Sequence, residues 1–173
     1  SFHFKHNDIV SCENALKRAT EIVAKTGGGI LLITEGVFGM TGALGILDQI
    51  VELKKKYQFR ILIDDAHGFG VMGPTGRGTS EHFGVMDEID LYIGAYAKSM
   101  ATIGGFVAGP KYVIDYLRYN MRSQMYAKSL PMPIVEGCLK RLEIIRSAEG
   151  DELRKKLWTV TRALQNGFRD LGF

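Results

Sequence analysis

The sequence has little cysteine and no long apolar run. Its two cysteines, Cys12 and Cys138, stand alone, without a Cys-x-x-Cys pair or a histidine-rich neighbour. That pattern argues against a structural zinc site and against a disulfide framework. No apolar stretch approaches the roughly eighteen residues that a membrane helix needs, and the first residues lack the layout of a signal peptide. We therefore expect a cytoplasmic chain without an integral membrane segment.

Charge of one sign is also scarce. The formal net charge is +3 over 173 residues, and the one basic block is Lys54 to Lys56. Such a block is more typical of the solvated end of a helix than of a nucleic-acid patch, because cations favour helix C-termini. Nucleic-acid binding is not expected. With 46% hydrophobic residues and 21 glycines, the composition is that of a globular chain with one ordinary core.

Apolar periodicity predicts alternating helices and strands. Asn7 or Asp8 can cap a first helix, which should end before a turn at the glycine triplet 27–29. A continuous apolar run such as 30–34 is typical of a strand that is buried on both faces. The predicted strands are 30–34, 60–64, 90–95 and 105–109; the later predicted helices are 43–57, 110–126, 131–147 and a last one that Asp151 caps.

The order of these elements predicts an α/β fold with a mostly parallel sheet. Strand, helix and strand from 30 to 64 form a right-handed parallel crossover. The connection between strands 90–95 and 105–109 is too short for a crossover helix, so that pair should be antiparallel. The glycine-rich stretch from Gly68 to Gly78 is expected to be an active-site loop, since long loops in compact domains are usually functional.

Three reactive side chains lie in or beside the loops that follow these strands. Asp64 ends an apolar strand, His67 follows it closely, and Lys98 lies in the short antiparallel connection. Open α/β sheets bind ligands at the carboxyl ends of their strands. There, a lysine can form a Schiff base and a carboxylate can keep a pyridine nitrogen protonated. Singly, a capping aspartate, a turn histidine and a surface lysine are commoner roles; together they suggest a pyridoxal phosphate (PLP) site.

Longer motifs surround these residues. They are Asp-Asp-Ala-His-Gly-x-Gly at 64–70, Gly-x-x-Gly-x-x-Gly-Arg-Gly at 70–78, Lys-Ser at 98–99, Gly-Gly-Phe at 104–106, His-Asn-Asp at 6–8, Thr-Glu-Gly-Val-Phe at 34–38 and Ser-Leu-Pro at 129–131. In combination they resemble the α-oxoamine synthases of the fold-type I PLP enzymes. That family includes serine palmitoyltransferase, 2-amino-3-ketobutyrate CoA ligase, 8-amino-7-oxononanoate synthase and 5-aminolevulinate synthase. The loop at 98–106 looks closest to the serine palmitoyltransferase branch.

The resemblance implies a role for each matching residue. Lys98 would form the Schiff base with PLP, Asp64 would bind the pyridinium nitrogen, and His67 would stack on the ring or bond its 3-hydroxyl. Ser99 is implied as a further cofactor contact. Arg77 and Ser129 are the candidates for binding the substrates. Arg77 lies between two glycines, and its guanidinium could clamp a carboxylate or phosphate or could equally fix its own loop.

The resemblance also implies an architecture and an activity. The fold would be the three-layer αβα sandwich of the aspartate-aminotransferase-like major domain, incomplete here, because members of the family are more than twice as long. Residues 1–149 would be part of this PLP-binding domain, and 150–173 a helix toward a C-terminal domain. The implied enzyme is a homodimer with shared active sites, which condenses serine or glycine with an acyl-CoA to give a 2-amino ketone, usually with decarboxylation.

Two departures from the family pattern leave an alternative open. Ala95 stands where a threonine usually bonds the cofactor phosphate, and Gly39 stands where a serine usually lies near the ring. Phosphate binding would then depend on backbone amides, Ser99, upstream residues, or Lys128 or Ser129 of a partner subunit. The alternative is a catalytically weak scaffold subunit of the same fold. A nicotinamide dehydrogenase is disfavoured, since no strand-to-helix Gly-x-Gly-x-x-Gly is present.

Overall fold

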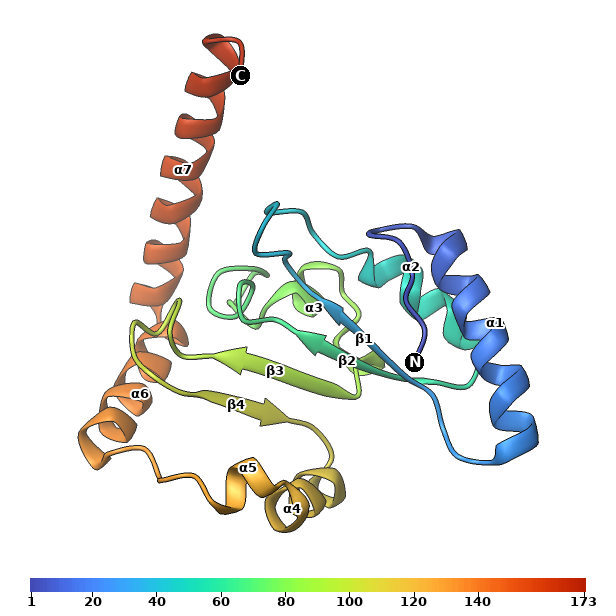
Figure 1. Cartoon of the computed structure of the whole chain (residues 1–173). Helices are drawn as coiled ribbons and strands as arrows, with labels where there is room; N and C mark the ends of the chain where they lie inside the picture. Colours follow the sequence, from blue (N-terminus) through green and yellow to red (C-terminus); the bar gives the residue numbers. More distant parts are fainter.

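Four short strands form one mixed sheet in the computed structural model, which describes residues 1–173 (Figure 1). The order across the sheet is β1-β2-β3-β4; the first three strands are parallel and β4 is antiparallel to β3. The strands are β1 (Leu31–Glu35), β2 (Arg60–Asp64), β3 (Leu91–Ala95) and β4 (Gly105–Ala108). The predicted parallel crossover and the antiparallel last pair are both confirmed.

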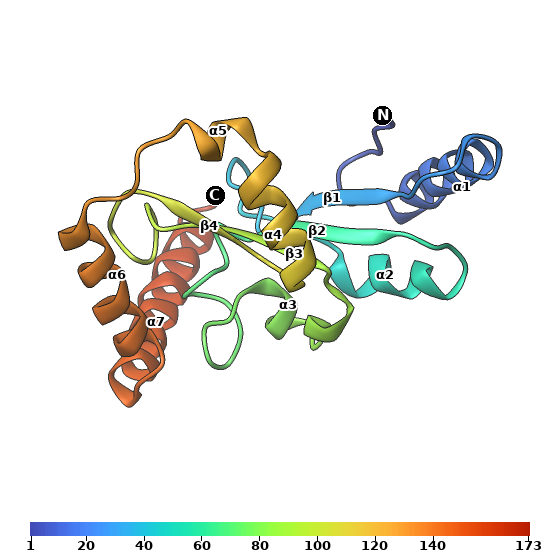
Figure 2. The ribbon, with the colours of Figure 1, turned by 90° about the horizontal axis from the view of Figure 1, so that it is seen from below.

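Helices lie on both sides of this sheet. Figure 2 shows α2 and α3 on one side of the sheet and α5 on the other, with α4 in front of the strands. The layered αβα arrangement is confirmed. No helix is long and apolar enough to cross a membrane. The helices are α1 (Ile9–Thr26), α2 (Leu47–Glu52) with the 3-10 turn η1 (Leu53–Lys55), α3 (Thr79–His82), η2 (Met86–Glu88), α4 (Lys111–Asn120), α5 (Arg122–Met125), α6 (Met132–Ile145) and α7 (Ala148–Asp170).

Helix α1 begins and ends where the sequence predicts. The Asp8 side chain accepts a hydrogen bond from the Ser11 N–H at 2.8 Å, which satisfies one of the free N–H groups at the helix start. At the other end Gly27 has φ of 75°, and its N–H bonds to the Val23 carbonyl. Glycine adopts this left-handed conformation without strain. The glycine triplet is thus a helix stop and turn, as predicted.

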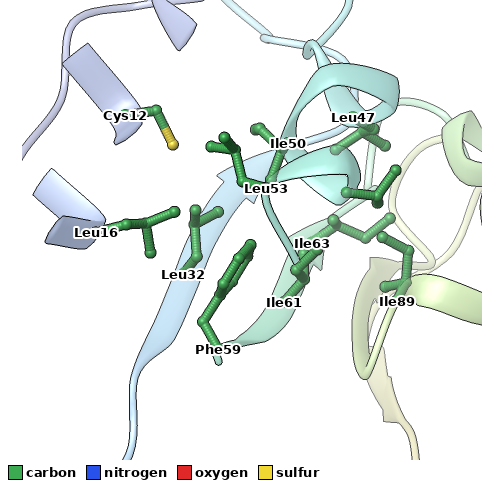
Figure 3. Packing of buried hydrophobic residues seen from close by; sticks show 11 residues of the cluster. Cys12, Leu16, Leu32, Leu47, Ile50, Leu53, Phe59, Ile61, Ile63 and Ile89 are labelled. Atoms are coloured by element: carbon green, nitrogen blue, oxygen red, sulfur yellow. The ribbon is translucent and has the colours of Figure 1, made fainter. Parts of the chain in front are cut away.

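The hydrophobic core lies between α1, α2 and one face of β1 and β2 (Figure 3). Alternate side chains of each strand point into it, as the period of a β-strand requires. The cluster is Cys12, Leu16, Leu32, Leu47, Ile50, Val51, Leu53, Phe59, Ile61, Ile63 and Ile89. Fully burying a side chain of this size contributes about 1.5–3 kcal/mol, so this cluster holds β1 and β2, and the loops that follow them, in fixed register.

The prediction that the first strand is buried on both faces is wrong. Leu32 and Thr34 are buried, whereas Leu31 and Ile33 are 49% and 59% exposed. The side chains of a strand alternate between its two faces, and of the two faces of β1 only the one toward α1 and α2 is covered. The apolar run at 30–34 therefore gives β1 two apolar faces, and only one of them packs into the hydrophobic core.

Three helix boundaries also differ from the predictions. The second helix begins at Leu47 and not at residue 43, because Leu44 pairs with Val37 in an isolated antiparallel bridge. The helix predicted over 110–126 breaks at Met121, whose ψ of 104° is extended and separates α4 from α5. Asp151 does not cap the last helix. It lies in the first turn of α7, after the N-cap Ser147, and pairs with Arg154.

The long helix α7 leaves the body of the molecule as a projecting rod (Figure 1). Its first turns are held to the glycine-rich loop and to α6. The buried Arg154 donates to the Ile145 carbonyl at 2.9 Å, and the Trp158 indole N–H donates to the Val71 carbonyl at 3.3 Å. Its later apolar stripe, which includes Leu164 and Phe168, is exposed.

Candidate active site

The parallel strands bring their carboxyl ends to one edge of the sheet. Glu35, the last residue of β1, pairs with Asp64, the last residue of β2, and Asp64 pairs with Ile93 of β3. The loops that follow these strands therefore begin side by side. Lys98 lies just beyond the end of β3, and His67 just beyond the end of β2. The three predicted residues thus lie at or just beyond the strand ends of one sheet edge, which is the usual place for a ligand in an open α/β fold.

Asp64 is half-buried at the end of β2. Its Oδ1 accepts a hydrogen bond from the Ala66 N–H at 3.1 Å, which starts the turn toward His67. A cavity of about 510 Å³ opens beside it and is lined in part by Glu35, Phe38 and His6. His6 packs edge-on against Phe38, with the ring centroids 4.3 Å apart. The second carboxyl oxygen of Asp64 remains free to meet a ligand group that carries a proton.

His67 is exposed and lies directly beside Gly39. A Cβ atom at position 39 would be 2.5 Å from the His67 Nε2 atom, well inside van der Waals contact. In this position of the ring, only glycine fits at residue 39. The departure from the family pattern at Gly39 therefore has a structural counterpart: the His67 imidazole lies where the Cβ atom of a serine would be.

Lys98 lies in the turn between β3 and β4. The turn is closed by hydrogen bonds from the Tyr96 N–H to the Gly104 carbonyl at 2.9 Å and from the Thr102 N–H to the Tyr96 carbonyl at 3.0 Å. Lys98 itself is exposed, so its amine is accessible. A short turn anchored by two strands places this amine with little backbone freedom, which suits a group that must reach one atom of a cofactor.

The other predicted site residues are distributed more widely. Ser99 packs against the glycine-rich loop: a Cβ atom at Gly70 would be 2.6 Å from the Ser99 Oγ atom, and Gly70 has φ of +80°. Arg77 is exposed on the outer part of that loop, where its N–H donates to the Glu81 carboxylate at 3.0 Å. Ser129 is exposed in the segment between α5 and α6. Arg77 thus belongs to the loop that follows Asp64, Ser99 packs against this loop, and Ser129 lies on a separate segment.

The glycine-rich loop is tightly hydrogen-bonded. The Gly70 N–H donates to the Gly76 carbonyl at 2.9 Å, and the Gly78 N–H donates to the Met72 carbonyl at 3.0 Å. The Glu81 carboxylate accepts further bonds from the N–H and the hydroxyl of Thr75. Burial alone would raise the pKa of Glu81, but these bonds lower it below the ordinary value.

One buried acid in this region was not predicted from the sequence. The Asp65 side chain is 3% exposed. Its Oδ2 accepts a bond from the Thr79 N–H at 2.7 Å, and its Oδ1 accepts one from the Thr79 hydroxyl at 2.5 Å. Burial raises the pKa of Asp65, and the two bonds from Thr79 offset that rise only in part. In the sequence it is merely the second of two adjacent aspartates, and nothing there distinguishes it from a solvated turn residue.

The residues at the sheet edge match the groups of PLP. A carboxylate suits a protonated ring nitrogen, an accessible lysine suits the aldehyde, and an exposed imidazole suits a ring or its hydroxyl. The fit is weaker for the phosphate. Ala95 ends β3 opposite Gly105 and has no hydroxyl, so Ser99 is the nearby hydroxyl in the following turn.

Comparison with known proteins identifies the class of this domain. The family model of class I and II aminotransferases matches residues 1–173. The chain belongs to this family, and the predicted resemblance to α-oxoamine synthases is confirmed by its relatives.

Two curated relatives show how similar this chain is in sequence to known enzymes. The chain is 58% identical over 172 residues to a cysteate-C-fatty acyltransferase of Capnocytophaga ochracea, covering 99% of this chain and 40% of that protein. It is 38% identical over 173 residues to a serine palmitoyltransferase of Bacteriovorax stolpii, covering 100% of this chain and 40% of that protein. The chain therefore spans about two fifths of the length of these relatives.

Solved structures agree with this assignment. The serine palmitoyltransferase of Sphingomonas wittichii superimposes with a TM-score of 0.88 at 32% identity, over 98% of this chain and 41% of that one. A serine palmitoyltransferase solved with PLP superimposes with a TM-score of 0.89 at 32% identity, over 98% of this chain and 41% of that one. This second structure contains PLP as an internal aldimine.

Proposed function

We propose that the enzyme containing this chain is a PLP-dependent acyltransferase, which joins the α-carbon of an amino acid to the acyl group of a thioester. The product would be a 2-amino ketone, formed with loss of the amino acid carboxylate as carbon dioxide. The observation that carries the proposal is the position of Asp64, His67 and Lys98 at or just beyond the carboxyl ends of neighbouring strands, at one sheet edge. The named activities of the relatives support it.

The side chains of this site have distinct tasks in such a reaction. Bound PLP would supply an electron sink for negative charge at the α-carbon. Asp64 would hold the ring nitrogen in its protonated form, and His67 would orient the ring through stacking or through the 3-hydroxyl. The Lys98 amine would anchor the aldehyde and, once displaced by the amino acid, would take the proton from the α-carbon.

For the amino acid, we propose cysteate ahead of serine or glycine. The relative with 58% identity is named for cysteate and a fatty acyl group, whereas the serine palmitoyltransferases match at 38–40%. Cysteate has a sulfonate where serine has a hydroxyl, so its side chain is larger and carries a negative charge. A site that accepts it must offer both room and hydrogen-bond donors.

The assembly and location are part of the same proposal. We propose a cytoplasmic homodimer with shared active sites, in which Ser129 and Lys128 of one subunit approach the other site. The exposed segment 126–129 is suited to such a contact. Residues 1–149 would belong to the PLP-binding domain, and 150–173 would lead toward the next domain, as the projection of α7 suggests.

The test uses the full-length enzyme. With added PLP it should show a visible absorption band, and Lys98→Ala should abolish the band. Lys140→Ala is a matched control, because Lys140 is also exposed but lies on α6 and pairs with Glu143; it should keep the band. A wild-type enzyme without a band would contradict the proposal.

The substrate follows from a second measurement. Release of free CoA thiol from a fatty acyl-CoA should be fastest with cysteate in a panel that includes serine and glycine. Faster release with serine or glycine would reject cysteate and leave the acyltransferase activity intact. A normal band without thiol release from any amino acid would favour the scaffold subunit instead.

A further inference from the structure

Asp65 is buried and fully hydrogen-bonded, and the reaction proposed above does not use it. Its N–H donates to the Ile93 carbonyl of β3 at 2.8 Å. Its carbonyl accepts bonds from the Gly68 N–H at 3.0 Å and the Phe69 N–H at 2.8 Å. With the two side-chain bonds from Thr79, all of its polar groups have partners. The peptide segment between Asp64 and His67 is thereby fixed to β3 on one side and to α3 on the other.

Three glycines from separate segments crowd the Asp65 carboxylate. Gly36 follows β1, Gly68 ends the turn after His67, and Gly78 precedes α3. A Cβ atom on any of the three would overlap an Asp65 carboxylate oxygen. Gly78 also has φ of +106°, which side chains rarely adopt. The packing of three chain segments is thus adjusted to one buried acid.

This arrangement joins the site to the far end of the glycine-rich loop. Thr79, the first residue of α3, is fully buried, and both its N–H and its hydroxyl donate to Asp65. The Asp65 carboxylate therefore links the two ends of the loop 66–78, because Asp65 precedes this loop and Thr79 follows it. The turn that carries Asp64 and His67 cannot move without breaking these bonds.

We propose that Asp65 is a positioning residue of the cofactor site, which acts by holding Asp64 and His67 at the sheet edge before PLP binds. The inference rests on the proposed function, because it assumes that Asp64 and His67 contact PLP. Asp65 itself would not touch the cofactor, since its side chain points into the protein and both its oxygens are engaged by Thr79.

The experiment compares four variants of the full-length enzyme. Thr79→Val keeps the shape of the side chain but leaves Asp65 Oδ1 buried without its donor. Thr79→Ser keeps the hydroxyl and is the rescue variant. Asp65→Asn keeps the volume among the three glycines but replaces an acceptor by a donor. Ser80→Ala is the matched control: Ser80 is equally buried and adjacent, but its hydroxyl contacts the Tyr92 hydroxyl and not Asp65.

Two quantities are measured for each variant: the thermal midpoint of the apoenzyme, and the Kd for PLP from the visible band. We expect the Kd to rise about tenfold in Thr79→Val and Asp65→Asn, the scale of one hydrogen bond to a charged group. Thr79→Ser and Ser80→Ala should keep the wild-type Kd. If Asp65→Asn does not fold, Thr79→Val and its rescue decide the question.

The outcomes separate this inference from the proposed function. A wild-type enzyme that binds no PLP through Lys98 overturns the proposed function, and the positioning role with it. If the wild type binds PLP while Thr79→Val lowers only the thermal midpoint and leaves the Kd unchanged, Asp65 is merely structural and the positioning role is wrong. An equal rise in Kd for Ser80→Ala would also overturn it, because the effect would then not depend on Asp65.

Discussion

A methyl group added at Gly36 should destabilise the protein far more than one added at Gly39, three residues along the same loop. The new Cβ at position 36 would overlap Asp65 Oδ1 and lie 2.6 Å from Thr79 Oγ1 and 2.9 Å from Thr79 Cβ. The backbone of Gly36 cannot retreat. Its N–H donates to the Asp64 carbonyl at 2.9 Å, and its carbonyl accepts from Gly45 at 2.7 Å.

The magnitudes follow from what each methyl group meets. Overpacking a rigid, buried site costs about 1–3 kcal/mol and occasionally more; Gly36→Ala should reach the upper part of that range, about 3 kcal/mol, since it meets a bonded carboxylate. At Gly39 the new Cβ meets only the exposed His67 ring, which can rotate away. Gly39→Ala should therefore change the free energy of unfolding by no more than about 0.5 kcal/mol.

The assay is urea unfolding of the full-length apoenzyme, followed by fluorescence and circular dichroism. Gly36→Ala should lower the urea midpoint with an unchanged slope, whereas Gly39→Ala should unfold with the wild-type curve. Similar midpoints for the two variants would refute the argument that the glycines around Asp65 are fixed by close packing. A large loss in Gly39→Ala would show that the His67 ring is held in place and is not free to rotate.

Two further predictions concern single side chains of the core region. Burial alone would raise the pKa of Asp90, but its bonds with Ile61 N–H, Arg60 and Lys54 lower it. Its stabilising contribution is therefore complete above the ordinary aspartate pKa of about 3.9 and is lost as pH falls through the lower folded value. Asp90→Asn should cost about 1–3 kcal/mol at neutral pH, with a difference from wild type that shrinks in acid unfolding curves; a pH-independent difference would contradict this. Burial, with Glu13 nearby, raises the pKa of the Cys12 thiol to about 11. Iodoacetamide should therefore not label Cys12 until the protein unfolds, as measured by mass spectrometry. Rapid labelling of the native protein would contradict the burial of Cys12.

The strands could be predicted closely because apolar runs and their polar boundaries are local signals. The predicted strand at 60–64 coincides with β2, and the other three differ by a residue or so at their ends. Burial was harder to predict, because it depends on which helices cover a face. Leu31 and Ile33 look like core residues in the sequence and are exposed in this chain. The start of α2 was placed too early because the bridge between Val37 and Leu44 is a tertiary contact.

The site shows the same division between local and tertiary signals. Asp64, His67 and Lys98 could be proposed because each follows a recognisable strand within a specific motif, and all three occur at one sheet edge. Asp65 could not, because its role depends on Thr79 and on glycines that approach from other segments. The residue type alone does not show whether an aspartate is buried or solvated. Only the packing around it distinguishes the two cases.

The glycine-rich loop, which the sequence predicts to be an active-site loop, also connects the two halves of the candidate site. At its base, Asp65 beside Asp64 is bonded to Thr79. In its middle, Gly70 packs against Ser99, the neighbour of Lys98. The residue proposed for the ring nitrogen and the residue proposed for the aldehyde are thus connected through a single hydrogen-bonded loop. A change in this loop should therefore alter the position of Lys98 relative to Asp64, even where the altered residue does not itself contact the cofactor.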